Sequence, residues 1–357
     1  MYTMTLEINQ RCNLRCRYCY LGEKNGTKMS YETACKAIDR AFLYTKIHKD
    51  QTLWIDFIGG EPLLDFDMIC KLVEYIYQKN AEVKYKLLFS LTTNATIFTE
   101  EILAFLLENE FAIKVSIDGD REVNDINRVD CSGDSVYDKI LANLVYLKEF
   151  EQKSGRFVQV TNVITGNNYD KYYESLVYLT KELGFKIIYT AIDVSYAWSP
   201  EEMTILMNGI RKSFDYFIEV AKKNQGFRWD FVDKVVNFKN KRKKFYTCGA
   251  GIISSYVRTE GGIYACPGNL STNAEIGTVE EGLKEEKIDS LKQFDSIDNP
   301  ECEACEISEY CTEQSCVMQN LTVMGDINKP IPVMCKLRKL IYEIYTQNED
   351  LIKRIVM

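Results

Sequence analysis

Histidine is almost absent from this sequence, which has a single one, His48, among 357 residues. Zinc, copper and non-haem iron sites built on histidine need several imidazoles, so these classes of metal site are excluded. A Ser-His or Cys-His nucleophile pair could use only His48. That residue lies in the polar segment 46–50, where we expect a solvent-exposed side chain.

Excess positive charge and long apolar runs are also missing. Lysine plus arginine number 44 against 52 aspartate plus glutamate, which gives a net charge of −8. Nucleic-acid binding needs a basic surface, so we expect no nucleic-acid partner. No apolar run approaches the roughly 20 residues that cross a bilayer, and the first residues lack a signal-peptide pattern. The sequence therefore predicts a cytoplasmic protein without a membrane partner.

Strand and helix patterns alternate over the first 200 residues or so. Runs rich in β-branched and aromatic residues predict strands at 3–9, 53–58, 85–92, 112–117, 157–164 and 186–191. Helical periodicity lies between them, near 30–45, 66–78, 99–108, 137–153 and 171–183. Six βα units in series predict the α/β class, as a partial (β/α)6 TIM-like barrel with its chemistry at the carboxyl ends of the strands.

Three regions follow from this pattern. Residues 1–200 form the barrel, and residues 201–245 form a helical linker. An amphipathic helix at 199–224 leads from the barrel into this linker, which also carries a solvated basic stretch at 239–244. Residues 246–357 form a small cysteine-rich domain with a C-terminal helix. Its turn-rich composition indicates a domain folded around metal rather than around an apolar core.

Cysteine, in contrast, is abundant, with 13 residues. In a reducing compartment thiols are metal ligands or catalytic groups rather than disulfides. Cys12, Cys16 and Cys19 follow the first predicted strand in a CxxxCxxC pattern. Three thiolates can hold three irons of a 4Fe–4S cluster and leave the fourth iron open. A structural zinc site would want a fourth ligand, and none lies nearby in the sequence.

This loop, with the aromatic Tyr18 before its last cysteine, resembles the radical S-adenosylmethionine (SAM) enzymes. Their second signature is a GGEP turn after the second strand, and the resemblance implies that it receives the methionyl amine of SAM. The cluster at Cys12, Cys16 and Cys19 would then reduce SAM to a radical that abstracts a hydrogen atom. The implied cofactor-binding residues are Tyr18, Gly59, Gly60, Glu61, Pro62, Asn94, Ser116, Asp118 and Arg128.

Two of these assignments have a structural alternative. Ser116 and Asp118 could form a strand-end turn that satisfies its own backbone. The chain also departs from many relatives by having Asn124-Asp125 where they have His-Asp, so no imidazole is available there.

The later cysteines resemble a SPASM domain, which binds two auxiliary 4Fe–4S clusters, so three clusters are implied in all. The interval between Cys311 and Cys316 is one residue longer than usual. The resemblance assigns one cluster to Cys302, Cys305, Cys311 and Cys335, and the other to Cys248, Cys266 and Cys316. Because seven cysteines are one short of two full sets of four, we predict an open iron. A zinc ribbon is the alternative.

The remaining cysteines and the polar residues that could line the barrel have the following predicted roles. Cys35 and Cys70 lie on apolar faces of predicted helices, and we expect them to be small core residues. Cys131 reads as a surface-loop thiol, with a ligand or substrate-handling role as the alternative. Inward-facing polar positions that could line the barrel are Glu7, Asn9, Asp56 and Asp193.

Most SPASM enzymes act on peptides or proteins. The resemblance therefore implies a radical SAM oxidoreductase that matures a ribosomally synthesised precursor peptide, and we expect a thioether crosslink to a substrate cysteine. The alternatives are an anaerobic sulfatase-maturating enzyme, a peptide epimerase and a carbon–carbon crosslinking enzyme. Sulfatase maturases carry an aspartate directly after the second SPASM cysteine, where this chain has Pro267. A regulatory iron–sulfur protein without turnover would not need the GGEP turn.

Several partners are implied as well. We expect a cysteine-containing precursor peptide and a flavodoxin or ferredoxin as electron donor. The chain begins at the first barrel strand, so a separate protein could bind the leader peptide that other maturases grip with an N-terminal domain.

Overall fold

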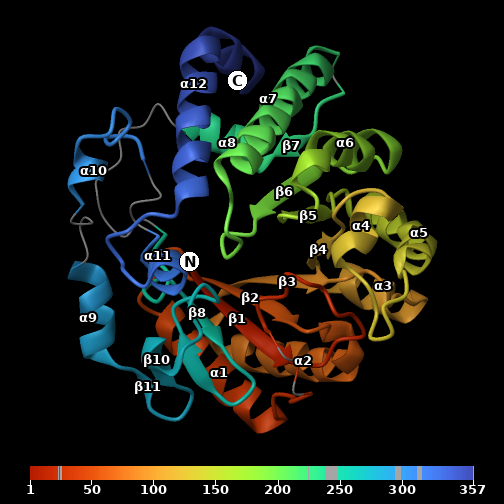
Figure 1. Cartoon of the computed structure of the whole chain (residues 1–357). Coiled ribbons are helices and arrows are strands. Elements are labelled where there is room, and N and C mark those ends of the chain that lie inside the picture. The colour runs from red at the N-terminus through yellow and green to blue at the C-terminus, as the bar shows by residue number, and fades with distance from the viewer. Residues whose placement is uncertain are drawn as a thin grey trace. The chain divides into compact units, whose positions relative to one another are not determined.

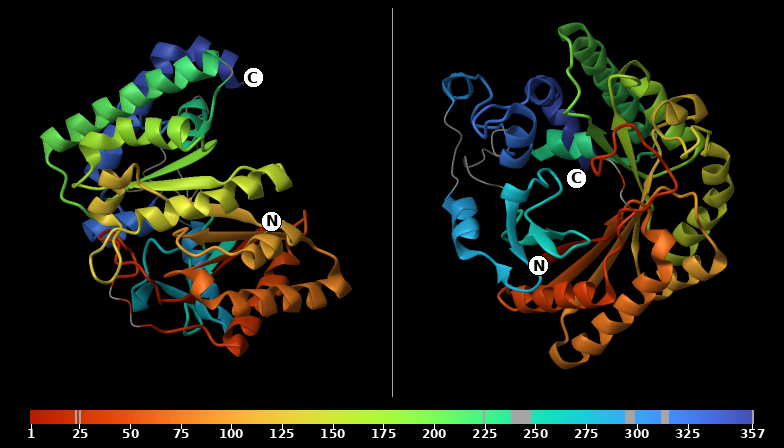
Figure 2. Two further views of the ribbon diagram at one scale, coloured as in Figure 1. Left: turned by 90° about the vertical axis from the view of Figure 1, so that its right-hand side faces the viewer. Right: turned by 60° about the horizontal axis from the view of Figure 1, so that its bottom comes forward.

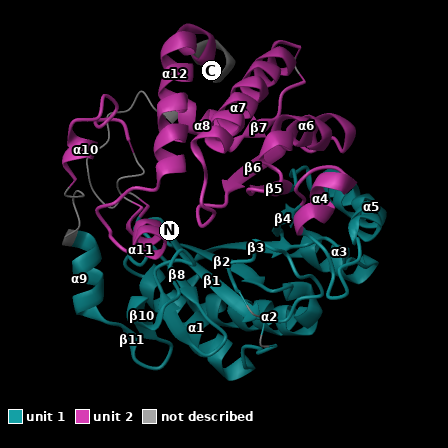
Figure 3. Ribbon diagram, viewed as in Figure 1, with its two compact units in different colours: residues 1–116, 128–158, 249–293 teal, residues 117–127, 159–248, 294–357 magenta. Residues whose placement is uncertain are grey.

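The computed structural model describes residues 1–22, 24, 26–223, 225–237, 248–293, 299–311 and 316–356 (Figure 1). They form two compact units that are interleaved along the chain (Figure 3). Unit 1 comprises residues 1–116, 128–158 and 249–293, and unit 2 comprises residues 117–127, 159–248 and 294–357. The basic stretch at 239–244 lies outside the described residues, and the predicted domain division stays a prediction.

Unit 1 is built on a largely parallel sheet. Its strands are β1 (Tyr2–Asn9), β2 (Thr52–Gly59), β3 (Lys86–Thr93), β4 (Ala112–Ser116), β8 (Ser254–Val257), β9 (Gly262–Tyr264), β10 (Glu275–Thr278) and β11 (Gly282–Leu283). Within the unit they follow the order β11-β10-β9-β8-β1-β2-β3-β4. Strands β1 to β4 and β8 run parallel, whereas β9, β10 and β11 pair antiparallel. The carboxyl ends of β1 to β4 therefore meet at one edge.

Alternation along β1 separates its two faces. Met4, Leu6 and Ile8 are buried on the face covered by helices, and Glu7 and Asn9 point to the other face. The helices of the unit are α1 (Tyr31–Thr45), α2 (Phe66–Val83), α3 (Glu100–Glu108), α5 (Tyr137–Ser154) and α9 (Glu285–Gln293), and α1 and α2 lie along one face of the strands (Figures 1 and 2). The predicted strands and helices of this region are present with ends shifted by a few residues.

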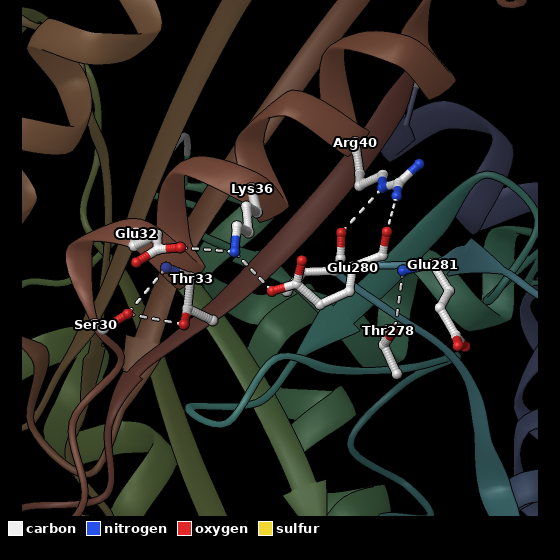
Figure 4. Close-up of polar contacts among 9 residues, drawn as sticks. Ser30, Glu32, Thr33, Lys36, Arg40, Thr278, Glu280 and Glu281 are labelled. Atoms are coloured by element: carbon white, nitrogen blue, oxygen red, sulfur yellow. Dashed lines mark hydrogen bonds and ion pairs between the residues drawn. The ribbon is translucent and has the colours of Figure 1, made fainter.

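The segment 249–293 is fastened to α1 as well as to β1. The Arg40 guanidinium donates to the carbonyl of Val279 (3.0 Å) and to the carbonyl of Glu280, and Lys36 pairs with the Glu280 carboxylate at 2.8 Å (Figure 4). Because β8 also pairs with β1, these contacts hold the segment that carries Cys266 on the unit that carries the first cysteine loop.

Unit 2 contains three parallel strands, β5 (Gln159–Ile164), β6 (Ile187–Ile192) and β7 (Arg228–Trp229). Its helices are α4 (Arg121–Asn127), α6 (Tyr172–Val177), α7 (Pro200–Lys222), α8 (Asp230–Asn237), α10 (Pro300–Glu303), α11 (Val317–Met324) and α12 (Pro332–Val356). The predicted helix at 199–224 is confirmed as α7. It begins with a capping box in which Ser199 and Glu202 satisfy each other's backbone amides.

The expectation for His48 is wrong, because its ring is half-buried and lies 5.8 Å from the Tyr2 ring. Burial lowers the pKa of His48, and the N-terminal ammonium adds to this effect. No helix among the described residues has the length and apolar character needed to cross a bilayer.

Candidate functional site

The first cysteine loop leaves β1 directly. Cys12, Cys16 and Cys19 are all half-buried, and the amide of Leu14 donates to the Cys12 sulfur at 3.4 Å. The amide of Cys19 donates to the carbonyl of Cys16 at 3.2 Å, which turns the loop back on itself. An amide that points at a sulfur suits a thiolate ligand, since hydrogen bonds to sulfur tune iron–sulfur clusters.

The GGEP turn after β2 is pressed against this loop. A Cβ added at Gly60 would lie 2.1 Å from the carbonyl oxygen of Arg11 and 3.1 Å from the Cys12 Cβ, so only glycine fits. The amide of Gly60 donates to the carbonyl of Asn9, and the amide of Glu61 donates to that of Arg11, both at 2.8 Å. The two signature motifs therefore form one tightly joined cradle.

Glu61 is the buried centre of that cradle and has no exposed surface. Its carboxylate accepts from the Thr93 hydroxyl at 2.9 Å, from the Asn94 amide at 2.7 Å and from the Leu63 amide at 3.1 Å. Burial raises the pKa of Glu61 above its ordinary range, and the hydrogen bonds and Arg128 oppose that shift. The side chain thus ties the end of β3 to the end of β2.

Asn94 brings the third strand end to the cysteine loop. Its side-chain amide donates to Asn13 Oδ1 at 2.9 Å and lies 3.8 Å from the Cys12 sulfur. Asn13 in turn donates to the Thr96 hydroxyl at 2.7 Å. A side-chain amide beside Cys12 is well placed to face a group bound at the cluster.

Arg128 and Tyr18 also meet at the loop. The Arg128 guanidinium donates to the Tyr18 hydroxyl at 2.7 Å, and Arg128 is 3% exposed. The chain after Arg128 continues along the cysteine loop, because the amide of Arg15 donates to the carbonyl of Val129 at 2.7 Å. Cys131 in that stretch is exposed, as expected for a loop thiol.

The other cofactor assignments stay predictions. Ser116 is the half-buried last residue of β4, in unit 1. Asp118 belongs to unit 2, where its carboxylate accepts from the Val163 amide at 3.0 Å and its own amide donates to Asn124 Oδ1 at 3.4 Å. These contacts join Asp118 to β5 and to α4 within unit 2.

The residues of this site suit a 4Fe–4S cluster and SAM. Three thiols share one loop, Gly60 leaves no space for a side chain beside it, and Asn94 and Arg128 present polar groups around it. In the described part of the chain, no three histidine, cysteine or acidic side chains meet at a point that could hold a single metal ion. In a 4Fe–4S cluster each cysteine ligates a different iron, so its cysteines need not meet at a point.

Four of the later cysteines lie in neighbouring segments of unit 2. Cys302 is in α10, Cys305 and Cys311 follow it, and Cys335 is in the first turn of α12. Three contacts join these segments: Asn299 donates to the carbonyl of Asn328 at 2.9 Å, Lys339 pairs with Glu306 at 3.6 Å, and the rings of Tyr310 and Tyr342 are 6.0 Å apart. This arrangement is compatible with the predicted four-cysteine ligand set.

The second predicted ligand set is divided between the units. Cys266 lies in unit 1, where the amide of Gly268 donates to its sulfur at 3.4 Å. Cys248 and Cys316 lie in unit 2. This ligand set, with its open iron, stays a prediction.

A polar network lies on the face of the unit 1 sheet opposite to α1 and α2, and the sequence predicted only part of it. Glu7 is completely buried and accepts from Gln10 at 2.8 Å and from the Tyr256 hydroxyl. Glu7 was predicted from strand alternation, whereas its partner Tyr256 is brought to it only by the pairing of β8 with β1.

A second polar group lies on the same face. Lys114 pairs with Asp56 at 3.1 Å, and Ser90 donates to Asp56 while it accepts from the Trp54 indole at 2.8 Å. Asp56, predicted to line the barrel, is therefore a half-buried ion-pair partner.

Comparison with known proteins identifies the family. The Radical SAM superfamily model matches residues 6–179. An uncharacterized protein of Methanocaldococcus jannaschii is 30% identical over 271 residues, which cover 75% of this chain and 85% of that protein. The chain therefore belongs to the radical SAM superfamily. It is an enzyme, and membership of this family implies that it uses SAM and a 4Fe–4S cluster.

More distant relatives extend over most of the chain. A cysteine-type anaerobic sulfatase-maturating enzyme of Clostridium novyi is 22% identical over 326 residues, covering 85% of this chain and 84% of that enzyme. The solved structure of native anSMEcpe with bound AdoMet and Cp18Cys peptide has a TM-score of 0.81 at 21% identity and covers 99% of both chains.

A second solved structure is that of Streptococcus suis SuiB bound to the precursor peptide SuiA. It has a TM-score of 0.63 at 16% identity and covers 94% of this chain and 75% of that chain. At these identities the likeness concerns the fold. It confirms the predicted α/β class, a radical SAM partial barrel with a cysteine-rich C-terminal region.

Proposed function

We propose that this protein is a radical SAM maturase that oxidises a cysteine-containing peptide and installs a thioether crosslink. The observation that carries the proposal is the joined cradle of Cys12, Gly60, Glu61 and Asn94, which fits a SAM-binding cluster. When bound there, the cluster and SAM supply a radical that abstracts a hydrogen atom from carbon. A relative with a bound peptide and the same fold over the whole chain supports a peptide substrate.

The cysteine-rich region supplies the reason to prefer crosslinking. Seven cysteines in two predicted sets leave one iron open, and that iron could bind the thiolate of a substrate cysteine beside the reacting carbon. A substrate thiolate held there would be positioned for carbon–sulfur bond formation. The side chains that hold the SAM cradle together would orient the cofactor and exclude water.

Formylglycine formation is the second candidate. It is favoured by the likeness to a cysteine-type sulfatase-maturating enzyme over 85% of this chain. Both candidates oxidise a cysteine-containing peptide, and they differ in the product. Pro267, which stands where sulfatase maturases carry an aspartate, weighs against the second candidate.

One incubation separates these reactions. The anaerobically reconstituted full chain is supplied with SAM, a reductant and two peptides: a cysteine-bearing sulfatase-motif peptide and a cysteine-bearing peptide encoded beside the gene. A product that lacks two hydrogens and no longer reacts with thiol reagents supports the crosslink. An aldehyde in the sulfatase peptide supports formylglycine formation. If neither peptide is altered while 5′-deoxyadenosine accumulates, the proposed substrate class is wrong.

A further inference from the structure

The aspartate that follows the GGEP turn does not do what its position in the chain predicts. Asp65 ends the short helical turn Pro62–Asp65 and occupies the N-cap position of α2. Aspartate is preferred at this position because its carboxylate accepts from the first free amides of the helix. The Asp65 side chain makes no such hydrogen bond. The helix therefore begins without its cap, and the carboxylate is used elsewhere.

Donors from both ends of the first cysteine loop meet at Asp65. Before the loop, Asn9 Nδ2 donates to Asp65 Oδ2 at 2.6 Å, and the Arg11 guanidinium pairs with Asp65 Oδ1 at 3.0 Å. After the loop, the Lys28 ammonium pairs with the same Oδ1. Both oxygens are occupied, and the Asp65 side chain is only 10% exposed. We call this group the loop clamp, and its members are Asn9, Arg11, Lys28 and Asp65.

The clamp joins the loop to a different segment than the backbone does at the same place. The Gln10 amide donates to the Thr27 carbonyl at 2.8 Å, and the Met29 amide donates to the Ile8 carbonyl at 2.9 Å. These bonds close the loop by joining its two ends to each other. Asp65 instead joins both ends to the segment that follows the GGEP turn, so the clamp sets the position of the whole loop against that turn.

Asn9 shows that the clamp is kept at a cost. Asn9 is completely buried, and its Nδ2 also donates to the Glu61 carbonyl at 3.1 Å, so both protons of its side-chain amide are used. Asn9 Oδ1 has no hydrogen-bond partner among the described residues. A buried acceptor without a partner is unfavourable, and the uncapped helix adds to that cost. Local rules are typically broken in this way at functional sites.

The spacing that the clamp fixes is one on which SAM binding depends. The cluster on the cysteine loop and the GGEP turn are both implied contacts of SAM, so SAM would bridge two segments that are about 40 residues apart in the chain. A ligand that bridges two segments binds more tightly when their geometry is fixed beforehand.

We propose that Asp65 is a positioning residue that fixes the cysteine loop against the GGEP turn and thereby raises the affinity for SAM. It acts through Asn9, Arg11 and Lys28 rather than on a substrate. This role is independent of which peptide the enzyme modifies.

Three variants and one matched control test the clamp in the reconstituted full chain. Asp65→Asn removes the charge and keeps the shape, Asp65→Glu restores the charge on a longer side chain, and Lys28→Met removes one of the two cations. Asp67→Asn is the control, because Asp67 is an exposed aspartate in the first turn of α2 and no described residue forms an ion pair with it. Arg11 is left unchanged because it adjoins Cys12.

The first readout is the dissociation constant for SAM. It is measured by anaerobic equilibrium dialysis of labelled SAM, without reductant or peptide, and is normalised to the iron content of each sample. Groups behind the ligands of a metal site typically contribute 10–100-fold. We expect Asp65→Asn to raise the dissociation constant about 10-fold, Lys28→Met to raise it less, and Asp65→Glu to recover part of the loss. Asp67→Asn should match the wild type.

The second readout separates positioning from folding. With reductant and without peptide, we expect Asp65→Asn to need more SAM for half-maximal 5′-deoxyadenosine formation, whereas the rate at saturating SAM and the iron content stay near wild type. A purely structural side chain would lower iron content and melting temperature and leave the normalised SAM affinity unchanged. An unchanged dissociation constant in Asp65→Asn, or weaker binding that only follows iron loss, overturns the proposal. If Asp65→Asn does not fold, an unchanged dissociation constant in Lys28→Met overturns it.

Discussion

At the scale of single residues, Gly60 is the position in the cradle with the least room for a side chain. A methyl group there would meet the backbone of Arg11, which cannot move without moving Cys12. We predict that Gly60→Ala lowers stability by about 1–3 kcal/mol, as overpacking does, and reduces the iron bound at the first loop. Gly209→Ala in α7 is the control, since its added Cβ meets nothing closer than 3.9 Å, and it should raise stability by roughly 0.5–1 kcal/mol. Thermal unfolding and iron content of both variants check this prediction.

Glu61 gives a residue-scale prediction about pH. Its pKa is raised by burial, so the folded state holds the proton more tightly than the unfolded chain, whose carboxyl titrates near about 4.3. The stabilising contribution is present below that pH and is lost as the pH rises through the folded-state pKa. We therefore expect the melting temperature of the wild type to fall relative to that of Glu61→Gln as the pH rises from 4 upward. A difference that does not vary with pH contradicts the raised pKa.

At the scale of elements, the turn between β10 and β11 depends on α1. Arg40 donates to two carbonyls of that turn, whereas Lys36 makes an exposed ion pair with Glu280 (Figure 4). We predict that Arg40→Met costs about 1–3 kcal/mol, since it leaves the partly buried Val279 carbonyl without its donor, and that Lys36→Met costs less than about 1 kcal/mol. Hydrogen exchange over residues 262–283 should accelerate in the first variant alone. Equal acceleration in both would contradict the distinction.

The sequence was sufficient for most elements and for the contiguous motifs of the site. Strand alternation and helical periodicity predicted β1 to β6 because each depends on neighbouring residues, and CxxxCxxC and GGEP each lie in one loop. It was not sufficient for contacts between distant strands. No local pattern joins Tyr256 to Glu7, because their proximity depends on the parallel pairing of β8 with β1. The burial of His48 against Tyr2 was missed for the same reason.

At the scale of the whole molecule, the proposed cofactor content predicts an iron stoichiometry. Three 4Fe–4S clusters need about 12 irons per chain, and replacing Cys12, Cys16 and Cys19 together by alanine should leave about 8. Cys131→Ala is the matched control and should retain all of them, because Cys131 is an exposed loop thiol. Iron and sulfide analysis after anaerobic reconstitution provides the measurement. About 4 irons falling to none would show that the C-terminal region holds no clusters.

The central claim is that the radical made at the first cysteine loop takes its hydrogen from a cysteine-containing peptide. The most direct measurement uses a candidate peptide deuterated at its carbon positions, supplied with SAM and a reductant to the reconstituted chain. We predict that deuterium appears in 5′-deoxyadenosine in proportion to the modified peptide, and that the Cys12→Ala variant forms neither product. Unlabelled 5′-deoxyadenosine beside an unmodified peptide, across every cysteine-containing candidate, would contradict the claim.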